Sequence, residues 1–247
     1  MKSKDSWSIL GDQDPYYGVL TDEKYKSSKL DEGVLTEFYN SGELQINHVV
    51  SLLKNFNIKV NKNIALDFGC GVGRLTIPIS KLGFGKVFGV DISEGMLLKA
   101  RLYTRELNLD EDIKYLNNLS LAPKNVDFVH SYIVLQHIET KIGYDIIAQM
   151  VQILNIDGVI AIHVPFYRWE KFSRRIISFL QKKVNIINYI TNICAGRPIF
   201  EPLMQMNIYN LNKIITILEA ENITDFHLVT EHDGSNLSGY ILGVKKK

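Results

Sequence analysis

Short apolar runs alternate with amphipathic stretches along most of the chain. Five runs have the length and composition of buried strands, at 64–68, 86–91, 113–116, 126–134 and 159–164. Apolar residues at helical spacing predict four helices, at 44–56, 73–82, 93–108 and 141–154. Ser41-Gly42 is a turn signal before the first helix, and Ser93 is the expected N-cap of the third. Strands that alternate with helices indicate a parallel sheet covered on both faces.

The alternation ends after residue 164. An irregular segment follows, which contains a basic amphipathic helix predicted at 169–183. The chain closes with a helix at 211–220, for which Asn210 is the expected N-cap. Two strands follow, at 226–231 and 240–244, around a turn at Asp233-Gly234. Two strands joined by a short turn must be antiparallel. We therefore expect an α/β fold: a Rossmann-like, seven-stranded, mostly parallel sheet with a C-terminal antiparallel hairpin and helices on both faces.

Composition narrows the class of protein. The 247 residues, of which 46% are hydrophobic, suit one large domain with a cap or an insertion. A net charge of +1 provides no field that would attract nucleic acid. Cys70 and Cys194 cannot form a disulfide framework, and no apolar run reaches the roughly 18 residues of a membrane span. Residues 1–8 lack the apolar region of a signal peptide, so we expect a cytoplasmic protein.

The candidate chemistry begins at the end of the first predicted strand, where residues 67–73 read DFGCGVG. Ligands of open α/β sheets bind at the carboxyl ends of the strands. Glycines let the backbone turn tightly there, and the next helix directs its positive end to the same place. The G-x-G-x-G spacing differs from the G-x-G-x-x-G of dinucleotide sites, and no Gly-Lys-Ser/Thr follows for a phosphate loop. A plain strand-to-helix turn is the alternative without a ligand.

Asp91 ends the second predicted strand. A carboxylate at this place can accept hydrogen bonds from both hydroxyls of a ribose. It would serve NAD as well as S-adenosylmethionine (SAM), so it indicates a nucleoside without choosing the cofactor. Its structural alternative is a second cap for the helix that begins at Ser93.

Three segments together resemble the class I SAM-dependent methyltransferases: 65–76 (ALDFGCGVGRLT), 89–93 with Met96, and 127–138 (DFVHSYIVLQHI). The resemblance extends from about residue 60 to residue 245 and includes the closing hairpin. It implies SAM as the cofactor and S-adenosylhomocysteine (SAH) as the product. It does not identify the methyl acceptor.

The resemblance assigns roles to individual residues. Asp67 is expected near the ammonium of SAM, and Asp91 at its ribose. Ile92 and Met96 are expected to pack on the adenine, and Asn117 and Asn118 stand where the family often has an acid that binds it. The loop and strand-end residues complete the predicted cofactor site: Gly69, Cys70, Gly71, Arg74 and Ser131.

The first 45 residues resemble the leader of bacterial methyltransferases from glycan and surface-polysaccharide pathways, through Trp7, 11–20 (GDQDPYYGVL) and 38–42. This implies an aromatic lid over the cofactor, whereas packing on the sheet edge is the alternative. We expect a single domain, residues 1–247, in four parts. They are an aromatic cap (1–45), a SAM-binding core (46–164), an insertion that serves as a substrate lid (165–206), and a closing helix with its hairpin (207–247).

Two histidines are candidates for the general base that an oxygen acceptor requires. His137 follows the fourth predicted strand, on the side of the cofactor cleft, and His163 ends the fifth. The structural alternative for His137 is a ring held by a backbone carbonyl. Tyr17, Arg168 and Glu201 are candidates for binding sugar hydroxyls or a phosphate of the substrate. We expect no metal site.

The basic helix permits three interpretations: a substrate lid or homodimer contact within 165–206, a membrane-surface helix, or a solvated helix. The expected function is methyl transfer to an oxygen of a sugar, a sugar nucleotide or another small polar metabolite, in polysaccharide biosynthesis. The alternatives are transfer to nitrogen of a small molecule or protein, a NAD-dependent oxidoreductase, and a non-catalytic SAM-binding protein. Near-neutral charge argues against nucleic acid, as does the lack of an Asn-Pro-Pro-Tyr type sequence at 130–134.

Overall fold

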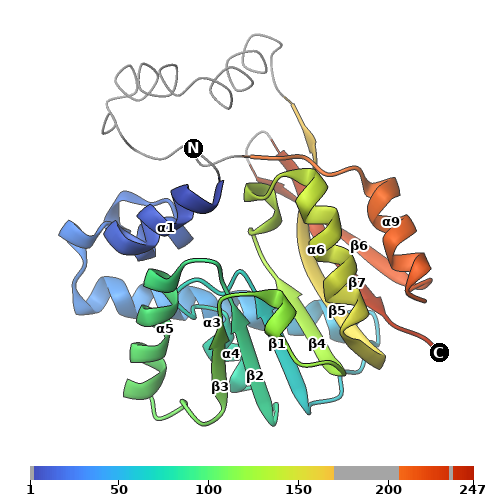
Figure 1. Ribbon diagram of the computed structural model, residues 1–247, viewed down its shortest axis with the longest axis horizontal. Helices are drawn as coiled ribbons and strands as arrows, with labels where there is room; N and C mark the ends of the chain where they lie inside the picture. Colours follow the sequence, from blue (N-terminus) through green and yellow to red (C-terminus); the bar gives the residue numbers. More distant parts are fainter. Residues whose placement is uncertain (1–2, 170–205, 234–235) are drawn as a thin grey trace.

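A computed structural model describes residues 3–169, 206–233 and 236–247 of the chain. Seven strands form one sheet in the order β3-β2-β1-β4-β5-β7-β6 (Figure 1). The strands from β3 to β5 in that order are parallel, and β7 pairs antiparallel with both β5 and β6. Their bounds are β1 Ile64–Phe68, β2 Lys86–Val90, β3 Ile113–Leu116, β4 Val126–Ser131, β5 Leu154–Arg168, β6 Phe226–Asp233 and β7 Asn236–Val244. The predicted fold class is confirmed.

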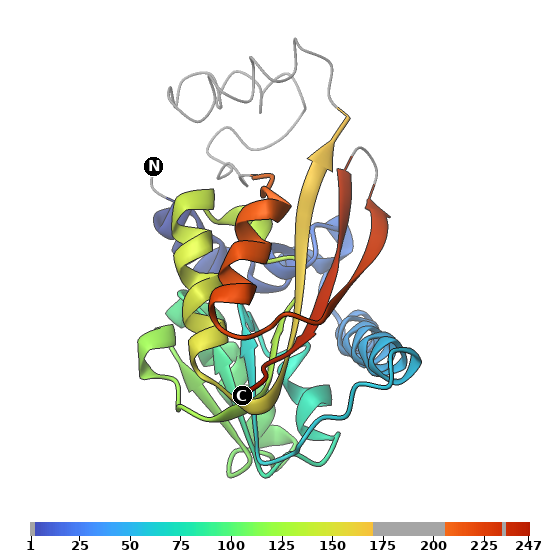
Figure 2. The ribbon, with the colours of Figure 1, turned by 90° about the vertical axis from the view of Figure 1, so that its right-hand side faces the viewer.

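Helices cover both faces of the sheet (Figure 2). Successive strand residues point to opposite faces, so Ala65 joins the core on one face and Leu66 the core on the other. Because both faces are buried, the central strands read as continuous apolar runs. The first face carries α3 (Glu32–Asn55), α4 (Thr76–Ser80) and α5 (Glu94–Glu106), and the second carries α6 (Thr140–Gln152) and α9 (Leu211–Ala220). The short helices are α1 Ser3–Gln13, α2 Pro15–Val19, η1 Glu23–Tyr25, η2 Ser27–Lys29, η3 Leu119–Leu121 and η4 Leu135–His137.

Both predicted N-caps are confirmed. The side chain of Ser93 accepts a hydrogen bond from the N–H of Met96 at 3.4 Å, at the start of α5. The side chain of Asn210 accepts one from the N–H of Asn212 at 2.9 Å, at the start of α9. These oxygens satisfy amides that have no partner within the first helical turn.

The predicted turn at Ser41-Gly42 is wrong, because both residues lie within α3. This helix begins at Glu32, where Asp31 caps it by accepting the N–H of Val34 at 2.8 Å. A Cβ on Gly42 would collide with the backbone carbonyl of Arg74. Glycine at this position therefore lets α3 pack closely against the loop after β1. In the sequence alone, such a glycine cannot be distinguished from one in a turn.

Strand β5 is longer than predicted, from Leu154 to Arg168, because β7 pairs with its second half as far as Arg168 and Asn236. Figure 2 shows β5, β6 and β7 rising together beyond the other strands of the sheet. Apart from Trp169, the predicted basic helix lies outside the described residues, as does most of the predicted lid. None of the helices in the described part of the chain has the length and apolar character to cross a membrane.

Candidate active site

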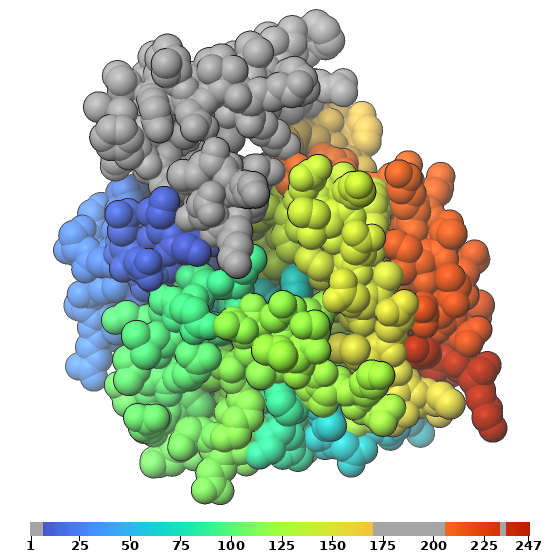
Figure 3. Space-filling model, in the orientation of Figure 1, coloured from blue at the N-terminus to red at the C-terminus, as the bar shows by residue number. Residues whose placement is uncertain are grey.

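A cavity of about 880 Å³ lies at the carboxyl ends of the parallel strands. Its walls come from the segments after β1, β2, β3 and β4, from α6, and from the N-terminal helices α1 and α2. Figure 1 shows α1 above these strand ends, and in Figure 3 the N-terminal segment lies against α5. The strand order reverses between β1 and β4, which is where open α/β sheets bind ligands. The volume is in the range of small-molecule sites, roughly 300–1,000 Å³.

The glycine-rich loop after β1 lines this cavity with backbone atoms, because its glycines have no side chain. Gly69 and Gly71 have φ angles of 75° and 52°, which glycine adopts without strain. A Cβ on Gly69 would collide with Val134, and one on Gly71 would lie 2.7 Å from Val19. The N–H of Gly69 donates to the carbonyl of Val90 at 2.7 Å, so the loop is tied to β2. A ligand can therefore approach the loop closely at a fixed place.

Asp91 lies beside this loop, directly after β2, and lines the cavity. Its Oδ2 accepts the N–H of Gly71 and its Oδ1 accepts the N–H of Ser93, both at 2.9 Å. Burial raises the pKa of Asp91, while these backbone donors act in the opposite direction. The carboxylate is thus held in one orientation, and each oxygen retains a lone pair for a hydroxyl of a ligand.

The predicted adenine residues line one end of the cavity. Met96 is buried, and Ile92 is 45% exposed. Asn117 donates from Nδ2 to Oε1 of Glu94 at 2.8 Å, and the side chain of Asn118 caps η3. Apolar side chains with polar groups at their edge suit a purine ring.

Two predicted cofactor residues, Asp67 and Ser131, do not line the cavity. Asp67 is buried, with Oδ2 accepting the hydroxyl of Thr76 at 2.7 Å and Oδ1 lying 2.9 Å from Nδ1 of His130. Ser131 is buried within β4. Both oxygens of Asp67 tie β1 to α4 and β4, and its expected position beside the cofactor ammonium stays a prediction.

Cys70 and Arg74 line the cavity. Burial raises the pKa of the Cys70 thiol well above its usual value, so this group is neutral and unsuited to act as a nucleophile. Nη1 of Arg74 donates to Oγ of Ser41 in α3 at 3.2 Å. Arg74 therefore links the cavity wall to the helix that packs behind it.

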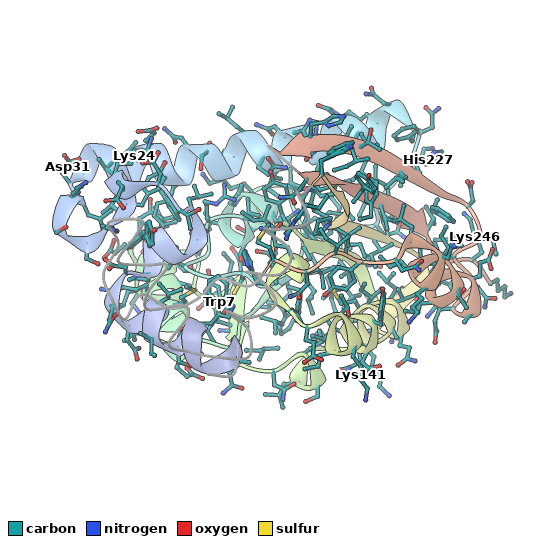
Figure 4. The ribbon with its side chains drawn as sticks, turned by 90° about the horizontal axis from the view of Figure 1, so that it is seen from above. Trp7, Lys24, Asp31, Lys141, His227 and Lys246 are labelled. Carbon is teal, nitrogen blue, oxygen red and sulfur yellow. The ribbon has the colours of Figure 1, made fainter. Side chains whose placement is uncertain are left out.

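His137 lines the cavity from η4, directly after β4. Trp7 of α1 packs edge-on against it, with 5.0 Å between ring centres, and Figure 4 shows Trp7 on the inner side of the N-terminal helices. Nε2 of His137 lies 3.1 Å from Nε2 of Gln136. When Gln136 donates this hydrogen bond, the histidine nitrogen is unprotonated, as a general base must be. Ile133 on the same segment has a φ of 53°, which strains a β-branched residue and is a feature of functional sites.

His163 does not line the cavity. Its ring lies edge-on to Tyr132 and Tyr240, at 4.9 and 5.5 Å between ring centres, and its Nε2 is 3.5 Å from Oε2 of Glu231. Burial lowers the pKa of His163 to about 4, so the ring is neutral at pH 7. The structure thus gives this second candidate base a buried, structural place, because the segment after β4, not β5, faces the cavity.

Acid should destabilise the protein through His163. Its pKa is about 4 in the folded state and about 6.5 in an unfolded chain, so the unfolded state binds the proton more readily. This contribution to stability is full above pH 6.5 and is lost as the pH falls toward 4, by about 2.5 kcal/mol at pH 4.5. Urea unfolding at pH 7 and pH 4.5 measures it.

The variant His163→Gln should lose about 2.5 kcal/mol less than the wild type on this acidification. His227→Gln, at a partly exposed histidine stacked on Phe56, is the matched control and should behave like the wild type. Equal losses in the wild type and in His163→Gln would contradict the assignment.

The predicted substrate residues are not brought together at the cavity. Tyr17 does not line it, and the ammonium of Lys26 lies 5.0 Å from its ring centre. Arg168 does not line it either, and its Nε donates to Oδ1 of Asn236 at 2.7 Å, across β5 and β7. Glu201 lies outside the described residues. A substrate role for these three residues stays a prediction.

Several cavity residues were not predicted. Ile142, Ile146 and Gln149 line it from one face of α6, at helical spacing. Ile142 is 52% exposed, and an apolar residue beyond the core-facing stripe is the signal that could have identified this wall. Gly18 and Val19 of α2 also line the cavity, so the N-terminal segment contributes backbone as well as aromatic side chains.

Residues 65–158 match the family model described as a methyltransferase domain. A ubiquinone biosynthesis O-methyltransferase from Dictyostelium discoideum is 30% identical over 129 residues, which cover 44% of this chain and 40% of that protein. A ribosomal protein L11 methyltransferase from Thermotoga maritima is 36% identical over 84 residues, or 34% of this chain and 31% of that protein. The chain thus matches less than half the length of these curated relatives.

The fold is similar over the whole chain to that of a magnesium protoporphyrin IX methyltransferase from Synechocystis, solved with bound SAH. The TM-score is 0.64 at 18% identity, with 99% of this chain and 100% of that chain covered. This likeness shows the fold. Residues 65–158 therefore match a methyltransferase domain, and the fold of the chain is that of this solved methyltransferase.

Proposed function

We propose that this protein transfers a methyl group from SAM to a hydroxyl oxygen of a small molecule and leaves SAH. Asp91 carries the proposal, because backbone N–H groups hold both of its oxygens beside a loop with no room for a Cβ. A carboxylate at the end of β2 suits a ribose, and bare backbone after β1 suits the amino-acid end of SAM. The methyltransferase family match supports SAM over NAD as the nucleoside.

The residues present fit this cofactor. Asp91 would accept the ribose hydroxyls, Ile92 and Met96 would contact the adenine, and Gly69 and Gly71 would meet the methionine end. When bound, SAM supplies a methyl group on a positively charged sulfur, already activated for in-line transfer. The chain therefore has to align the acceptor oxygen with that methyl group and exclude water. The cavity wall contributed by α1 and α2 serves the exclusion of water.

His137 is the proposed general base. A hydroxyl must lose its proton as the new carbon–oxygen bond forms, and a base at hydrogen-bond distance accelerates this. Nε2 of His137 would take the proton once the acceptor hydroxyl replaces the amide of Gln136 on its single lone pair, while Trp7 holds the ring in place. The position of this ring after β4 puts it on the far side of β1 from Asp91.

The acceptor is proposed only as a class. By its name the Dictyostelium relative is an O-methyltransferase, which supports an oxygen acceptor. Neither relative supports the sugar acceptor or the polysaccharide pathway expected from the N-terminal segment. The L11 methyltransferase relative by its name acts on a protein, which keeps transfer to a protein as the second candidate. A homodimer contact within 165–206, the four-part domain division and a cytoplasmic location stay predictions.

Thermal unfolding with added ligands tests the cofactor. SAM and SAH should each raise the Tm, since a ligand that binds only the folded state adds about 2.7 kcal/mol at 100 times its Kd. NAD at the same concentration should leave the Tm unchanged. Stabilisation by NAD without stabilisation by SAM would replace the proposal with an oxidoreductase.

A further inference from the structure

Arg74 is a buried cation on the wall of the cavity. The residue is 4% exposed, and it lines the cavity directly after the glycine loop. Within the described residues, its Nε has no hydrogen-bond partner and its guanidinium forms no ion pair. Arg101, by contrast, is partly exposed and lies 3.4 Å from the carboxylate of Glu94. A buried donor without a partner needs an explanation.

The contacts of Arg74 within the fold do not explain why a charged residue occupies this buried position. Nη1 donates to the hydroxyl of Ser41, and the guanidinium carbon lies 6.0 Å from the ring centre of Phe38. An uncharged side chain of similar length could fill the same space behind α3. Removing a charge from water without a partner is strongly unfavourable, so a buried guanidinium normally pairs with an anion.

The described surroundings supply no carboxylate of their own for this pairing. Asp67 acts on Arg74 electrostatically, but both of its oxygens are already hydrogen-bonded within the fold. Burial lowers the pKa of Arg74, and the phenols of Tyr132 and Tyr240, with Asp67, act in the opposite direction. Burial raises the pKa of the Tyr240 phenol, so this group is neutral at pH 7 and cannot pair with Arg74 as an anion.

Two of the phenols that act electrostatically on Arg74, those of Tyr132 and Tyr240, lie on the β4 side of β1. Asp91 follows β2 on one side of β1, whereas Tyr132 and His137 both follow β4 on the other side. Tyr240 of β7 stacks on Tyr132 at 5.6 Å between ring centres, still farther from β2. Arg74 itself follows the glycine loop, so its charge acts between the segment after β1 and the segment after β4 that carries the proposed base.

On the basis of the proposed function, we propose that Arg74 binds an anionic group of the methyl acceptor. The substrate is then a hydroxyl compound that also carries a carboxylate, a phosphate or another oxyanion. A guanidinium binds such groups through parallel N–H donors, and the buried Nε–H of Arg74 has no partner among the described residues. Pairing at this point fixes the acceptor with its hydroxyl toward His137.

Inorganic phosphate is a probe that tests the site without knowledge of the substrate. The full chain saturated with SAH is titrated with phosphate by calorimetry, at an ionic strength held constant with NaCl. We expect saturable binding to the wild type and binding weakened about 10-fold or more in Arg74→Met. The Kd values for SAM and for 5′-methylthioadenosine, which lacks the methionine carboxylate, should change by less than about threefold.

Two further variants control this experiment. Arg101→Met removes a cation outside the cavity and should bind phosphate like the wild type. Arg74→Lys keeps the charge but loses the fork of donors, so it should bind phosphate more weakly than the wild type and more tightly than Arg74→Met. If Arg74→Met does not fold, as judged by circular dichroism, the wild type and Arg74→Lys decide the outcome.

Three results would overturn the inference. They are no saturable phosphate binding to the wild type, equal binding to the wild type and the Arg74 variants, and weaker SAM binding in Arg74→Met with 5′-methylthioadenosine unaffected. The last result would assign Arg74 to the carboxylate of the cofactor. A wild type that binds neither SAM nor SAH would instead contradict the proposed function, so the two failures are distinguishable.

Discussion

Replacing Asp91 with Ala should weaken SAM binding about 100-fold. Hydrogen bonds to a charged group contribute about 1.5–3 kcal/mol each, so loss of two from the ribose hydroxyls costs at least about 3 kcal/mol, or 100-fold. The variant also leaves the N–H of Gly71 and the N–H of Ser93 without their acceptor, which loosens the loop that meets the methionine end. Isothermal titration calorimetry with SAM and SAH measures the effect.

Asp91→Asn refines this result, because an amide oxygen can accept only part of the hydrogen bonds that the carboxylate accepts. It should bind SAM with intermediate affinity. Asp110→Asn, at an exposed aspartate outside the cavity, is the matched control and should bind like the wild type. A Kd for Asp91→Ala within about threefold of the wild type would remove Asp91 as the ribose ligand.

Replacing His137 with Ala should lower kcat about 100-fold or more while the Kd for SAM changes little. General bases contribute factors of about 10²–10⁴, and the cofactor residues do not depend on this ring. The measurement is methyl transfer from labelled SAM to an accepted hydroxyl substrate, together with SAM calorimetry on the same variant. The fall in kcat/KM on acidification, which reports protonation of the base, should be absent from the variant.

His227→Ala is the matched control, since this histidine lies outside the cavity against Phe56. Trp7→Phe keeps an aromatic edge against the imidazole and should retain most activity. An unchanged kcat in His137→Ala, with a folded protein and normal SAM binding, would show that positioning alone drives the transfer. An amine acceptor would be the next candidate in that case, because it can attack as a free base.

The sequence predicted those features that depend on neighbouring residues. The glycine loop, Asp91 at a strand end, and the caps Ser93 and Asn210 all combine a local pattern with a local physical requirement. The alternation of apolar runs also predicted the parallel sheet and its closing hairpin. These signals needed no knowledge of what packs against them.

The features that the sequence did not predict depend on distant partners. The family resemblance placed Asp67 at the cofactor, and no local pattern shows that its partner is His130, 63 residues farther along the chain. Gly42 mimicked a turn because the carbonyl that it must accommodate belongs to Arg74. His163 was predicted to end its strand, but β7 pairs with β5 as far as Arg168, so His163 lies within the strand, packed against Tyr132 and Tyr240.

A crystal structure of the SAH complex tests the central claim most directly. The account predicts both ribose hydroxyls on the carboxylate of Asp91, the homocysteine end against Gly69 and Gly71, and His137 facing the sulfur across an open acceptor space. SAH bound away from Asp91 and the glycine loop, or a cavity in which His137 is separated from the sulfur by other side chains, would contradict it.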